Sequence, residues 1–412
     1  MTRETGVLVI GGGGTGVGVA RDLAMRGVGV TLCERDGLGQ GTSGRSHGLL
    51  HSGARYAESD PKGARECIPE SRTLKRIAGE CIRDSGGYFL QVTGDDPAYF
   101  EEKRAACEEV GIDFEVRSGE TAREMVPALS SEVERVMEVP DGLIYPSRLV
   151  AATAKSAREH GARVRTHAPV TDLHVEGGRV TGATVGGEAG GENETRIDAE
   201  YVVNATGAWA GRLDERLAVE MEPAKGVMVA VPYDGLDPVL NRCREPDDGD
   251  IVIPHPEQAI LGTTSVPVAD PEEYDREDWE IERVIEECGA MVPGVEDREP
   301  ERVYWGVRPL YAPDEAEREQ RGISRGFFLL DHEARDDLGG ICSIVGGKLT
   351  THRLMAEAVA DHVTERLGVE AACHTAEETL PGADDPTVLD RYVEEFDARG
   401  PADEDVLGTR VD

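Results

Sequence analysis

The sequence predicts an α/β protein in which a nucleotide-binding domain, assembled from separated stretches of the chain around a parallel sheet, carries an inserted α+β domain. Two observations predict this class. The chain opens with a strand, a glycine-rich turn, a helix and a second strand, and strands of the same buried kind recur in mid-chain and late in the chain. A length of 412 residues exceeds the usual size of one domain, so we expect more than one.

The first unit consists of a strand, a helix and a strand. Residues 6–10 are a short, almost wholly apolar run, typical of a strand buried on both faces of a parallel sheet. Apolar residues at helical spacing predict a helix over residues 15–26, which Gly27 ends. Residues 28–33 form the second strand, and together the three elements make a β-α-β unit of about thirty residues.

The same patterns predict the later elements. They are a helix at 147–160, a strand at 162–166, a hairpin of 170–175 with 179–185, a strand at 201–205, a strand at 340–345 and a helix at 349–367. Alternating strands such as 227–231 and 251–253 lie between these pieces and indicate a second, mainly antiparallel sheet.

These elements predict how the chain is divided. We expect residues 1–67, 141–215 and 335–375 to form the nucleotide-binding domain. Residues 68–140 and 216–334 would form the inserted substrate or cap domain. Residues 376–412 would be an acidic segment with a helix at 387–398.

The charge of the chain excludes some functions. A net charge of −37 leaves no basic excess to release phosphate counterions, so we expect no nucleic-acid partner and no binding to an anionic membrane surface. Only six of the 44 cationic residues are lysine, and the acid is spread over the whole chain. Such a surface suits high salt, where charge repulsion is screened, so we expect a halophilic cytoplasm. An acidic mesophilic enzyme is the alternative, which leaves the shortage of lysine unexplained.

The cysteines and the apolar runs predict a soluble chain without a metal site. The eight cysteines form no C-x-x-C pair, so neither an iron–sulfur cluster nor a zinc knuckle is indicated, and we expect reduced, mostly buried thiols. No basic-then-apolar leader precedes the first strand, and no apolar run approaches the ~20 residues that span a bilayer.

The glycine-rich turn indicates a dinucleotide site. Residues 11–16 satisfy the G-x-G-x-x-G pattern between a strand and a helix. Gly11 permits the tight turn, Gly13 lets a pyrophosphate approach the backbone, and Gly16 lets helix and strand pack closely. Glu34 ends the second strand about twenty residues later, where a carboxylate accepts the ribose hydroxyls. The motif does not separate NAD from FAD.

Residues 41–56 (GTSGRSHGLLHSGARY) decide between the two cofactors by resemblance. This stretch resembles the flavin-binding loop of FAD-dependent glycerol-3-phosphate dehydrogenases, in particular that of the A subunit of the anaerobic enzyme. The resemblance continues in order through residues 13–27, 205–210, 262–265, 306–310, 329–332 and 346–350. It implies a discontinuous Rossmann-like FAD-binding domain of the glutathione-reductase or D-amino-acid-oxidase type.

The resemblance also implies an activity and a cofactor site. We expect oxidation of sn-glycerol 3-phosphate to dihydroxyacetone phosphate, with electrons passing through partner subunits to membrane quinone and the chain peripheral on the inner face of the membrane. The expected FAD contacts are Gly11, Gly13, Gly14, Thr15, Gly16, Glu34, Arg35, Thr42, Ser43, Ser46, His47, Gly48, Leu49, Val170, Ala205, Thr206, Gly207, Gly346, Gly347, Lys348, Leu349 and Thr350. The helix after Gly346-Gly347 would stabilise negative charge on the reduced flavin.

The sequence departs from the family pattern at two places, and the second of them bears on electron transfer. Ser265 stands where aerobic relatives usually have Asp, and the cysteine-bearing C-terminal module of the anaerobic family does not follow Asp412. The route by which electrons leave is therefore open, as is the question whether the chain is naturally short or truncated.

Local cations must attract a substrate that a chain of this charge repels. Arg55, Arg308 and Lys348 match family positions at the substrate site, where arginine clamps phosphate bidentately and lysine offers a point charge. We expect His51 to take the proton of the C2 hydroxyl, because neutral imidazole titrates in the useful range. Alternatively His51 only orients substrate or flavin, and Arg308 or Lys348 lowers the pKa of the hydroxyl.

Three further residues are candidate substrate contacts. Tyr56 follows the flavin loop, and Thr263 and Thr264 belong to a family-like stretch, although packing explains all three equally well. Two other functions stay open. One is an FAD oxidase or dehydrogenase of an amino acid or 2-hydroxy acid, which predicts a carboxylate clamp. The other is a noncatalytic flavin-binding protein that transfers electrons for a partner, whose function would be unchanged by Arg308→Ala.

Overall fold

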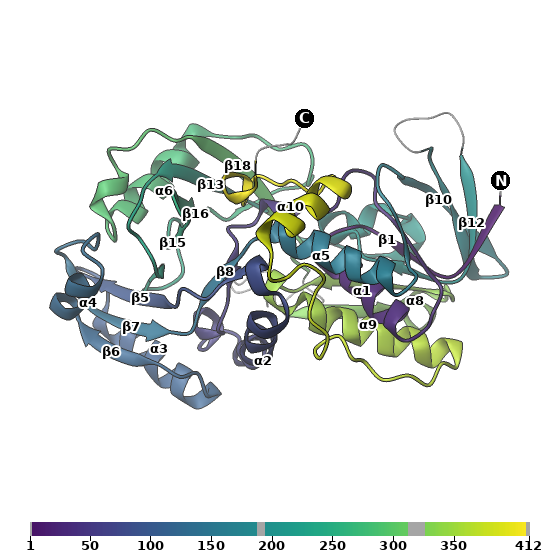
Figure 1. Ribbon diagram of the computed structural model, residues 1–412, viewed down its shortest axis with the longest axis horizontal. Helices are drawn as coiled ribbons and strands as arrows, with labels where there is room; N and C mark the ends of the chain where they lie inside the picture. The colour runs from purple at the N-terminus through teal and green to yellow at the C-terminus, as the bar shows by residue number, and fades with distance from the viewer. Residues whose placement is uncertain (1, 188–193, 312–325, 409–412) are drawn as a thin grey trace.

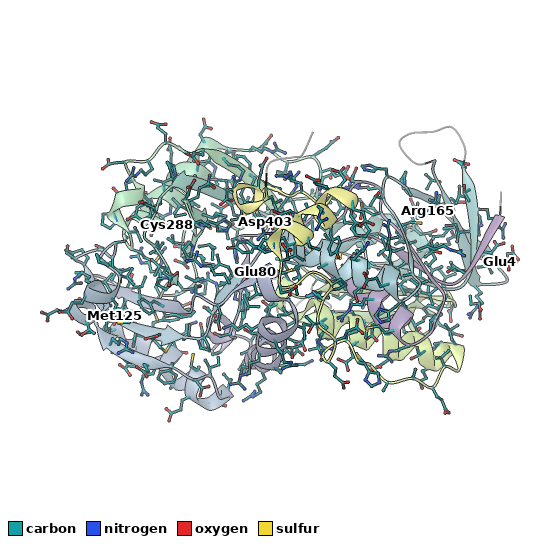
Figure 2. All side chains as sticks on the ribbon, viewed as in Figure 1. Glu4, Glu80, Met125, Arg165, Cys288 and Asp403 are labelled. Atoms are coloured by element: carbon teal, nitrogen blue, oxygen red, sulfur yellow. The ribbon has the colours of Figure 1, made fainter. Side chains whose placement is uncertain are left out.

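The computed structural model describes residues 2–187, 194–311 and 326–408. Two lobes lie side by side, as Figure 1 shows, each built around its own sheet. Met125 and Cys288 mark the second lobe in Figure 2, and Glu4 and Arg165 mark the first.

The first lobe contains an eight-stranded sheet within the described residues. Its parallel strands are β9 (Arg163–Arg165), β2 (Val30–Cys33), β1 (Thr2–Ile10), β12 (Thr195–Asn204) and β20 (Ile341–Gly346). The hairpin β10 (Val170–Glu176) and β11 (Arg179–Val185) joins β12 antiparallel, and β19 (Phe327–Asp331) joins β20. Each strand predicted in the first β-α-β unit, and the predicted hairpin, is therefore confirmed.

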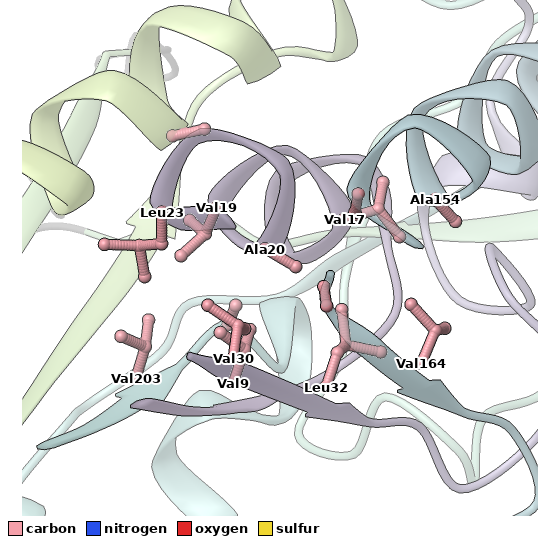
Figure 3. Packing of buried hydrophobic residues seen from close by; sticks show 14 of the residues in the cluster. Val9, Val17, Val19, Ala20, Leu23, Val30, Leu32, Ala154, Val164 and Val203 are labelled. Atoms are coloured by element: carbon pink, nitrogen blue, oxygen red, sulfur yellow. The ribbon is translucent and has the colours of Figure 1, made fainter. Parts of the chain in front are cut away.

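Helices cover one face of this sheet and form a shared core with it. They are α1 (Gly14–Met25), α5 (Pro146–Glu159) and α9 (His352–Leu367), and α10 (Pro386–Glu395) packs on α5. Figure 3 shows Val17, Val19, Ala20 and Leu23 of α1 facing Val9, Val30, Leu32 and Val203 of the strands. These aliphatic side chains lie in the core because the strands are buried on both faces.

Within the described residues, the second lobe contains a nine-stranded sheet that is antiparallel except where β14 meets β5. Its strands in spatial order are β18 (Arg302–Arg308), β13 (Ala224–Pro232), β16 (Gln258–Gly262), β15 (Ile251–Pro254), β14 (Val239–Arg242), β5 (Gly87–Val92), β7 (Val133–Val139) and β6 (Glu115–Ser118), with β17 (Val266–Pro267) also beside β13. Helices α3 (Pro97–Val110), α4 (Gly119–Met125) and α6 (Asp278–Gly289) belong to this lobe. The mainly antiparallel sheet confirms the predicted α+β architecture.

Small elements join the lobes. Strands β3 (Leu49–Leu50), β8 (Gly142–Ile144) and β4 (Ile82–Arg83) form a three-stranded sheet, and α2 (Pro61–Ile77) lies near the middle of the molecule in Figure 1. The start of α2 packs with Tyr99 and Phe100, whereas its end packs with Leu50 and Leu149. The predicted boundary after residue 67 therefore cuts a helix that contacts both lobes.

Two other predictions need correction. Strand β19 falls within residues 216–334, which were predicted for the inserted domain. It pairs with β20 of the first sheet, so the predicted end of the inserted domain at residue 334 is wrong. The predicted helix at 349–367 begins as a 3₁₀ turn, η8 (Leu349–Thr351), before α9, and His332–Asp336 form the short helix α8. Strand pairing is a long-range property that composition along the chain does not encode.

Two further features of the fold are the state of its cysteines and the length of its helices. All eight cysteines lie in the described part of the chain, where no disulfide forms, and only Cys373 is not fully buried. Among the described residues, no helix has the length and apolarity to cross a bilayer.

Candidate functional site

The carboxyl ends of β1, β2, β12 and β20 open into a cavity of about 580 Å³, as expected for ligand sites of open parallel sheets. The second lobe contributes residues of β13 and β18 to its wall. Most predicted cofactor residues line it: Gly11, Gly13, Gly14, Thr15, Glu34, Arg35, Thr42, Ser43, Ser46, His47, Leu49, Val170, Ala205, Thr206, Gly207, Gly346, Gly347, Lys348 and Leu349. The predicted reaction-site residues His51, Tyr56, Thr263 and Arg308 line the same cavity.

The glycine-rich turn lets three backbone segments come together. Gly11 has a φ of +107°, and a Cβ there would lie 2.5 Å from the carbonyl oxygen of Ala205. A Cβ on Gly16 would lie 2.0 Å from the carbonyl oxygen of Gly11. Gly16 is absent from the cavity wall, so its role is the predicted close packing of helix against strand.

The start of α1 is suited to an anion. No side chain caps Gly13, the residue before the helix, and the backbone N–H of Gly14 donates to Ser43 Oγ at 3.0 Å. A Cβ on Gly13 would lie 3.3 Å from Ser43 Oγ, and one on Gly14 would lie 2.7 Å from Leu349 Cδ1, so glycine keeps this space open. The positive end of the helix dipole therefore faces a cavity into which a pyrophosphate fits.

Glu34 is held at the end of β2. Its Oε2 accepts the backbone N–H of Gly12 at 2.6 Å, and its Oε1 accepts that of Asp36 at 3.0 Å. Burial raises the pKa of the Glu34 carboxyl. Each carboxylate oxygen still has a lone pair for a hydroxyl, so Glu34 is placed to accept hydrogen bonds from a ribose.

The loop after β2 is fastened to the second lobe. Thr42 Oγ1 donates to the carbonyl of Val307 at 2.6 Å, and the Tyr304 hydroxyl donates to the carbonyl of Ser46 at 3.2 Å. The backbone N–H of Leu49 donates to His47 Nδ1 at 3.1 Å. The second sheet thus shapes the wall formed by Thr42, Ser46 and His47.

His51, Tyr56 and Lys348 form a connected group. Tyr56 Oη lies 3.3 Å from His51 Nε2, and Lys348 Nζ lies 4.3 Å from the centroid of the Tyr56 ring. Lys348 Nζ is also 3.9 Å from Asp60 Oδ2. The backbone N–H of His51 donates to Thr350 Oγ1 at 3.1 Å. Thr350 is buried and lies outside the wall, where it supports the backbone of His51, and its cofactor contact stays a prediction.

Arg308 is oriented by the second sheet. Its Nη2 donates to Thr263 Oγ1 at 3.2 Å and to the carbonyl of Thr264 at 3.0 Å, and its Nη1 donates to the carbonyl of Lys225 at 3.4 Å. The Thr264 hydroxyl is fully buried and donates to Glu280 Oε1 at 2.8 Å. Thr263 therefore lines the cavity as predicted, whereas Thr264 lies behind it.

Two further predicted contacts lie outside this wall. Arg55 does not line the cavity. Its guanidinium lies 3.4 Å from Asn241 Oδ1 and 3.7 Å from the buried Asp250 carboxylate, and its substrate contact stays a prediction. Gly48 lies outside the wall, and a Cβ there would lie 2.7 Å from the carbonyl of Ile144, so it permits a close backbone approach.

Several residues of the wall had no role in the sequence-based prediction. Trp209 lines the cavity with the Arg35 guanidinium 4.7 Å from its ring centroid, and Glu272 of the second lobe forms an ion pair with Arg35. Trp209 follows the predicted turn at 205–207, so its position in the sequence could have indicated a place in the wall. No local sequence pattern indicates Glu272. His352 also lines the wall and donates from Nδ1 to the carbonyl of Leu349 at 2.8 Å.

The wall fits the cofactor that the flavin-loop resemblance implies. It provides a glycine-lined helix start for a pyrophosphate, a carboxylate for a ribose and the 346–349 turn beside the 46–51 loop for a ring system. Among the described residues, no cluster of three or more His, Cys, Asp or Glu side chains is arranged to hold a metal ion.

Comparisons with known proteins agree with this site. The family model described as FAD dependent oxidoreductase (DAO) matches residues 6–362. The chain is 51% identical over 428 residues to the A1 subunit of the anaerobic glycerol-3-phosphate dehydrogenase of Haloferax volcanii, covering 100% of this chain and 73% of that protein. It is 41% identical to the A subunit of the anaerobic enzyme of Escherichia coli, covering 93% of this chain and 71% of that protein.

Solved structures share the fold. A glycerol-3-phosphate dehydrogenase from Bacillus halodurans complexed with FAD superposes with a TM-score of 0.68 at 23% identity, covering 92% of this chain and 68% of that one. A glycine oxidase from Geobacillus kaustophilus superposes with a TM-score of 0.71 at 23% identity, covering 92% of this chain and 98% of that one. At such identities the likeness concerns the fold alone.

Proposed function

Because this chain belongs to the family of FAD-dependent oxidoreductases, and within it to the A subunits of anaerobic glycerol-3-phosphate dehydrogenases, we propose that it oxidises sn-glycerol 3-phosphate to dihydroxyacetone phosphate. The observation that carries this proposal is the composition of one cavity. Its wall combines a dinucleotide cradle with Arg308 and Lys348, two cations suited to a phosphate dianion, and with the imidazole of His51.

In this proposal the chain's residues bind the substrate and move one proton. FAD, when bound, supplies a hydride acceptor at N5. Arg308 and Lys348 hold the phosphate, and Thr263 lines the space beside Arg308. As hydride leaves C2, His51 takes the hydroxyl proton and the C2–O bond becomes a carbonyl. Tyr56 and Thr350 keep the imidazole in place through their hydrogen bonds to it and to its backbone.

The electrons leave through partner subunits in this proposal, since the relatives are themselves named as one kind of subunit of an anaerobic enzyme. We expect them to reach membrane quinone and the chain to lie peripherally on the inner face of the membrane. A cytoplasm of high salt agrees with the net charge of −37. Of the described residues, we assign 2–60, 141–187, 194–215 and 327–375 to the FAD-binding domain and 78–140 with 216–311 to the cap domain, with α2 in contact with both.

The test is the visible spectrum of the purified chain in concentrated KCl, before and after anaerobic addition of sn-glycerol 3-phosphate. Lactate and glycine are the control substrates. We expect bound flavin whose bands are bleached by the phosphate ester alone. Bleaching by a control alone would replace the substrate with a 2-hydroxy acid or an amino acid. Flavin that no substrate bleaches would favour the noncatalytic electron-transfer role.

A further inference from the structure

Residues 396–407, which we call the strap, run beside the loop that lines the cavity. That loop comprises residues 37–47, and Gln40, Thr42 and Ser43 are among its wall residues. The backbone N–H of Leu38 donates to the carbonyl of Phe396 at 3.2 Å. Gln40 Nε2 donates to the carbonyls of Asp397 and Arg399 at 3.1 and 3.0 Å. Main-chain carbonyls of the strap therefore accept hydrogen bonds from one side of the loop.

The contact between strap and loop is close enough to require glycine on both. A Cβ on Gly37 would lie 1.9 Å from the carbonyl oxygen of Asp397, and a Cβ on Gly400 would lie 2.7 Å from that of Gly44. The carbonyl of Gly44 also accepts the backbone N–H of Ala402 at 3.2 Å. Such backbone contact fixes the path of the loop, because neither partner can shift without moving the other.

Asp403 anchors the strap in the first lobe. Its carboxylate is fully buried and accepts the Ser147 hydroxyl at 2.6 Å and the Ser147 backbone N–H at 2.9 Å, at the start of α5. Ser147 Oγ in turn accepts the backbone N–H of Gly400 at 3.0 Å. One buried pair thus fixes the strap on both sides of Ala402, whose backbone N–H donates to the carbonyl of Gly44.

Asp405 ties the strap to the second lobe. Its carboxylate lies 2.9 Å from His255 Nδ1 and 3.0 Å from Arg302 Nη2, which belong to the β15–β16 turn and to β18. Figure 2 shows Asp403 between the two lobes. The strap therefore contacts the loop at 37–47 and also both lobes.

From these contacts we propose that the strap is a positioning element for bound FAD, and that Asp403 is its positioning residue. It acts through the loop at 37–47 and touches no reacting atom. This inference uses the FAD site of the proposed function but not its substrate. It assigns a role in cofactor retention to a segment that the sequence marked only as acidic and helical.

The test measures FAD affinity in Asp403→Asn and in the milder Ser147→Ala, in concentrated KCl. Apoprotein is titrated with FAD, and flavin fluorescence and the visible band shape are followed while far-UV circular dichroism confirms folding. The control is Asp385→Ala, which removes the cap of α10 at the end of the helix opposite the strap, where Asp385 Oδ1 accepts the backbone N–H of Thr387 at 2.9 Å. We expect the Kd for FAD to rise about tenfold or more in the first two variants, as losing a buried charge-assisted hydrogen bond implies, and to change less than about twofold in the control.

Three outcomes would overturn the inference. One is a lower Tm in Asp403→Asn and Ser147→Ala with FAD affinity and band shape unchanged, which would make the strap merely structural. The second is an equal rise in Kd in Asp385→Ala. The third is a parent chain that binds no FAD, which would overturn the cofactor assignment as well. Glycerol 3-phosphate plays no part in the readout, so failure of the substrate proposal would leave the result standing.

Discussion

Half of the six lysines of this protein have buried side chains. All six lysines lie in the described part of the chain, and Lys62 alone is exposed. Three have buried side chains in ion pairs: Lys103 with Glu58, Lys225 with Glu280 and Lys348 with Asp60. The outer surface therefore takes its cations almost entirely as arginine, which agrees with the proposed adaptation to high salt. Of these three buried lysines, Lys348 is the one that lines the cavity.

Arg308→Lys tests the phosphate clamp. A lysine loses the planar fork that Arg308 presents between Thr263 and the cavity, so we expect KM for glycerol 3-phosphate to rise about 10–100-fold. Anaerobic flavin reduction followed by stopped flow gives this value, and the affinity for FAD is the control. A KM within about twofold of the parent would remove Arg308 from substrate binding.

Glu280→Gln tests the buried pair behind Arg308. Glu280 Oε2 lies 2.6 Å from Lys225 Nζ, and both side chains are buried. The variant leaves the ammonium unpaired, so we expect the free energy of unfolding to fall by about 3–5 kcal/mol. Denaturant titration measures it. The double variant Lys225→Met/Glu280→Gln should regain part of the loss, and a double variant no more stable than the single one would contradict this account.

At the scale of elements, the junction of β1 and α1 depends on one glycine that lies outside the cavity wall. A Cβ at Gly16 would lie 2.0 Å from a backbone oxygen that cannot move aside. We expect Gly16→Ala to abolish FAD binding or folding, measured by flavin retained after gel filtration. Gly29→Ala is the matched control, since its Cβ would meet Gly6 N at an ordinary 3.8 Å. Full flavin content in Gly16→Ala would disprove the packing argument.

Helix α9 contributes a pH dependence through its first residue. Burial, with Arg353 and Arg21 nearby, lowers the pKa of His352 to about 4. The unfolded chain therefore takes up a proton before the folded one does as pH falls. The contribution of this group to the free energy of unfolding is therefore fully present above pH ~6.5. It falls by about 3 kcal/mol as the pH falls to about 4.

The variant His352→Gln isolates this effect. Its free energy of unfolding should fall less steeply than that of the parent between pH ~6.5 and ~4, at one fixed KCl concentration. Other buried groups, such as Asp403, whose pKa burial raises to about 6, titrate equally in both proteins and cancel in the comparison. Parallel pH profiles of parent and variant would refute the assignment.

At the scale of the whole molecule, the net charge of −37 predicts a strong salt dependence. Self-repulsion is screened as the Debye length falls from ~10 Å at 0.1 M to ~3 Å at 1 M salt. We expect Tm to rise by tens of degrees between about 0.1 and 3 M KCl, measured by scanning calorimetry. A Tm that is flat or falls over this range would favour the acidic mesophilic alternative.

The sequence by itself determined the local parts of this protein. The strands around the glycine turn, the helix α1 and the 170–185 hairpin were predictable because each depends on periodicity and turn chemistry within one short stretch. The same holds for Gly11, Glu34, His51, Arg308 and Lys348, which short motifs singled out as candidates and which line one cavity.

Only the tertiary structure decided which residues far apart in the sequence contact one another. Arg55 lies in the flavin-loop stretch of the sequence, yet its guanidinium lies 3.7 Å from the carboxylate of Asp250, a residue far along the chain. Strand β19 belongs to the first sheet because of its pairing with β20. The strap contacts the loop at 37–47, from which it is separated by more than three hundred residues of sequence. Such contacts arise when the chain is packed, since burial, pairing and charge then act between segments that no local pattern connects.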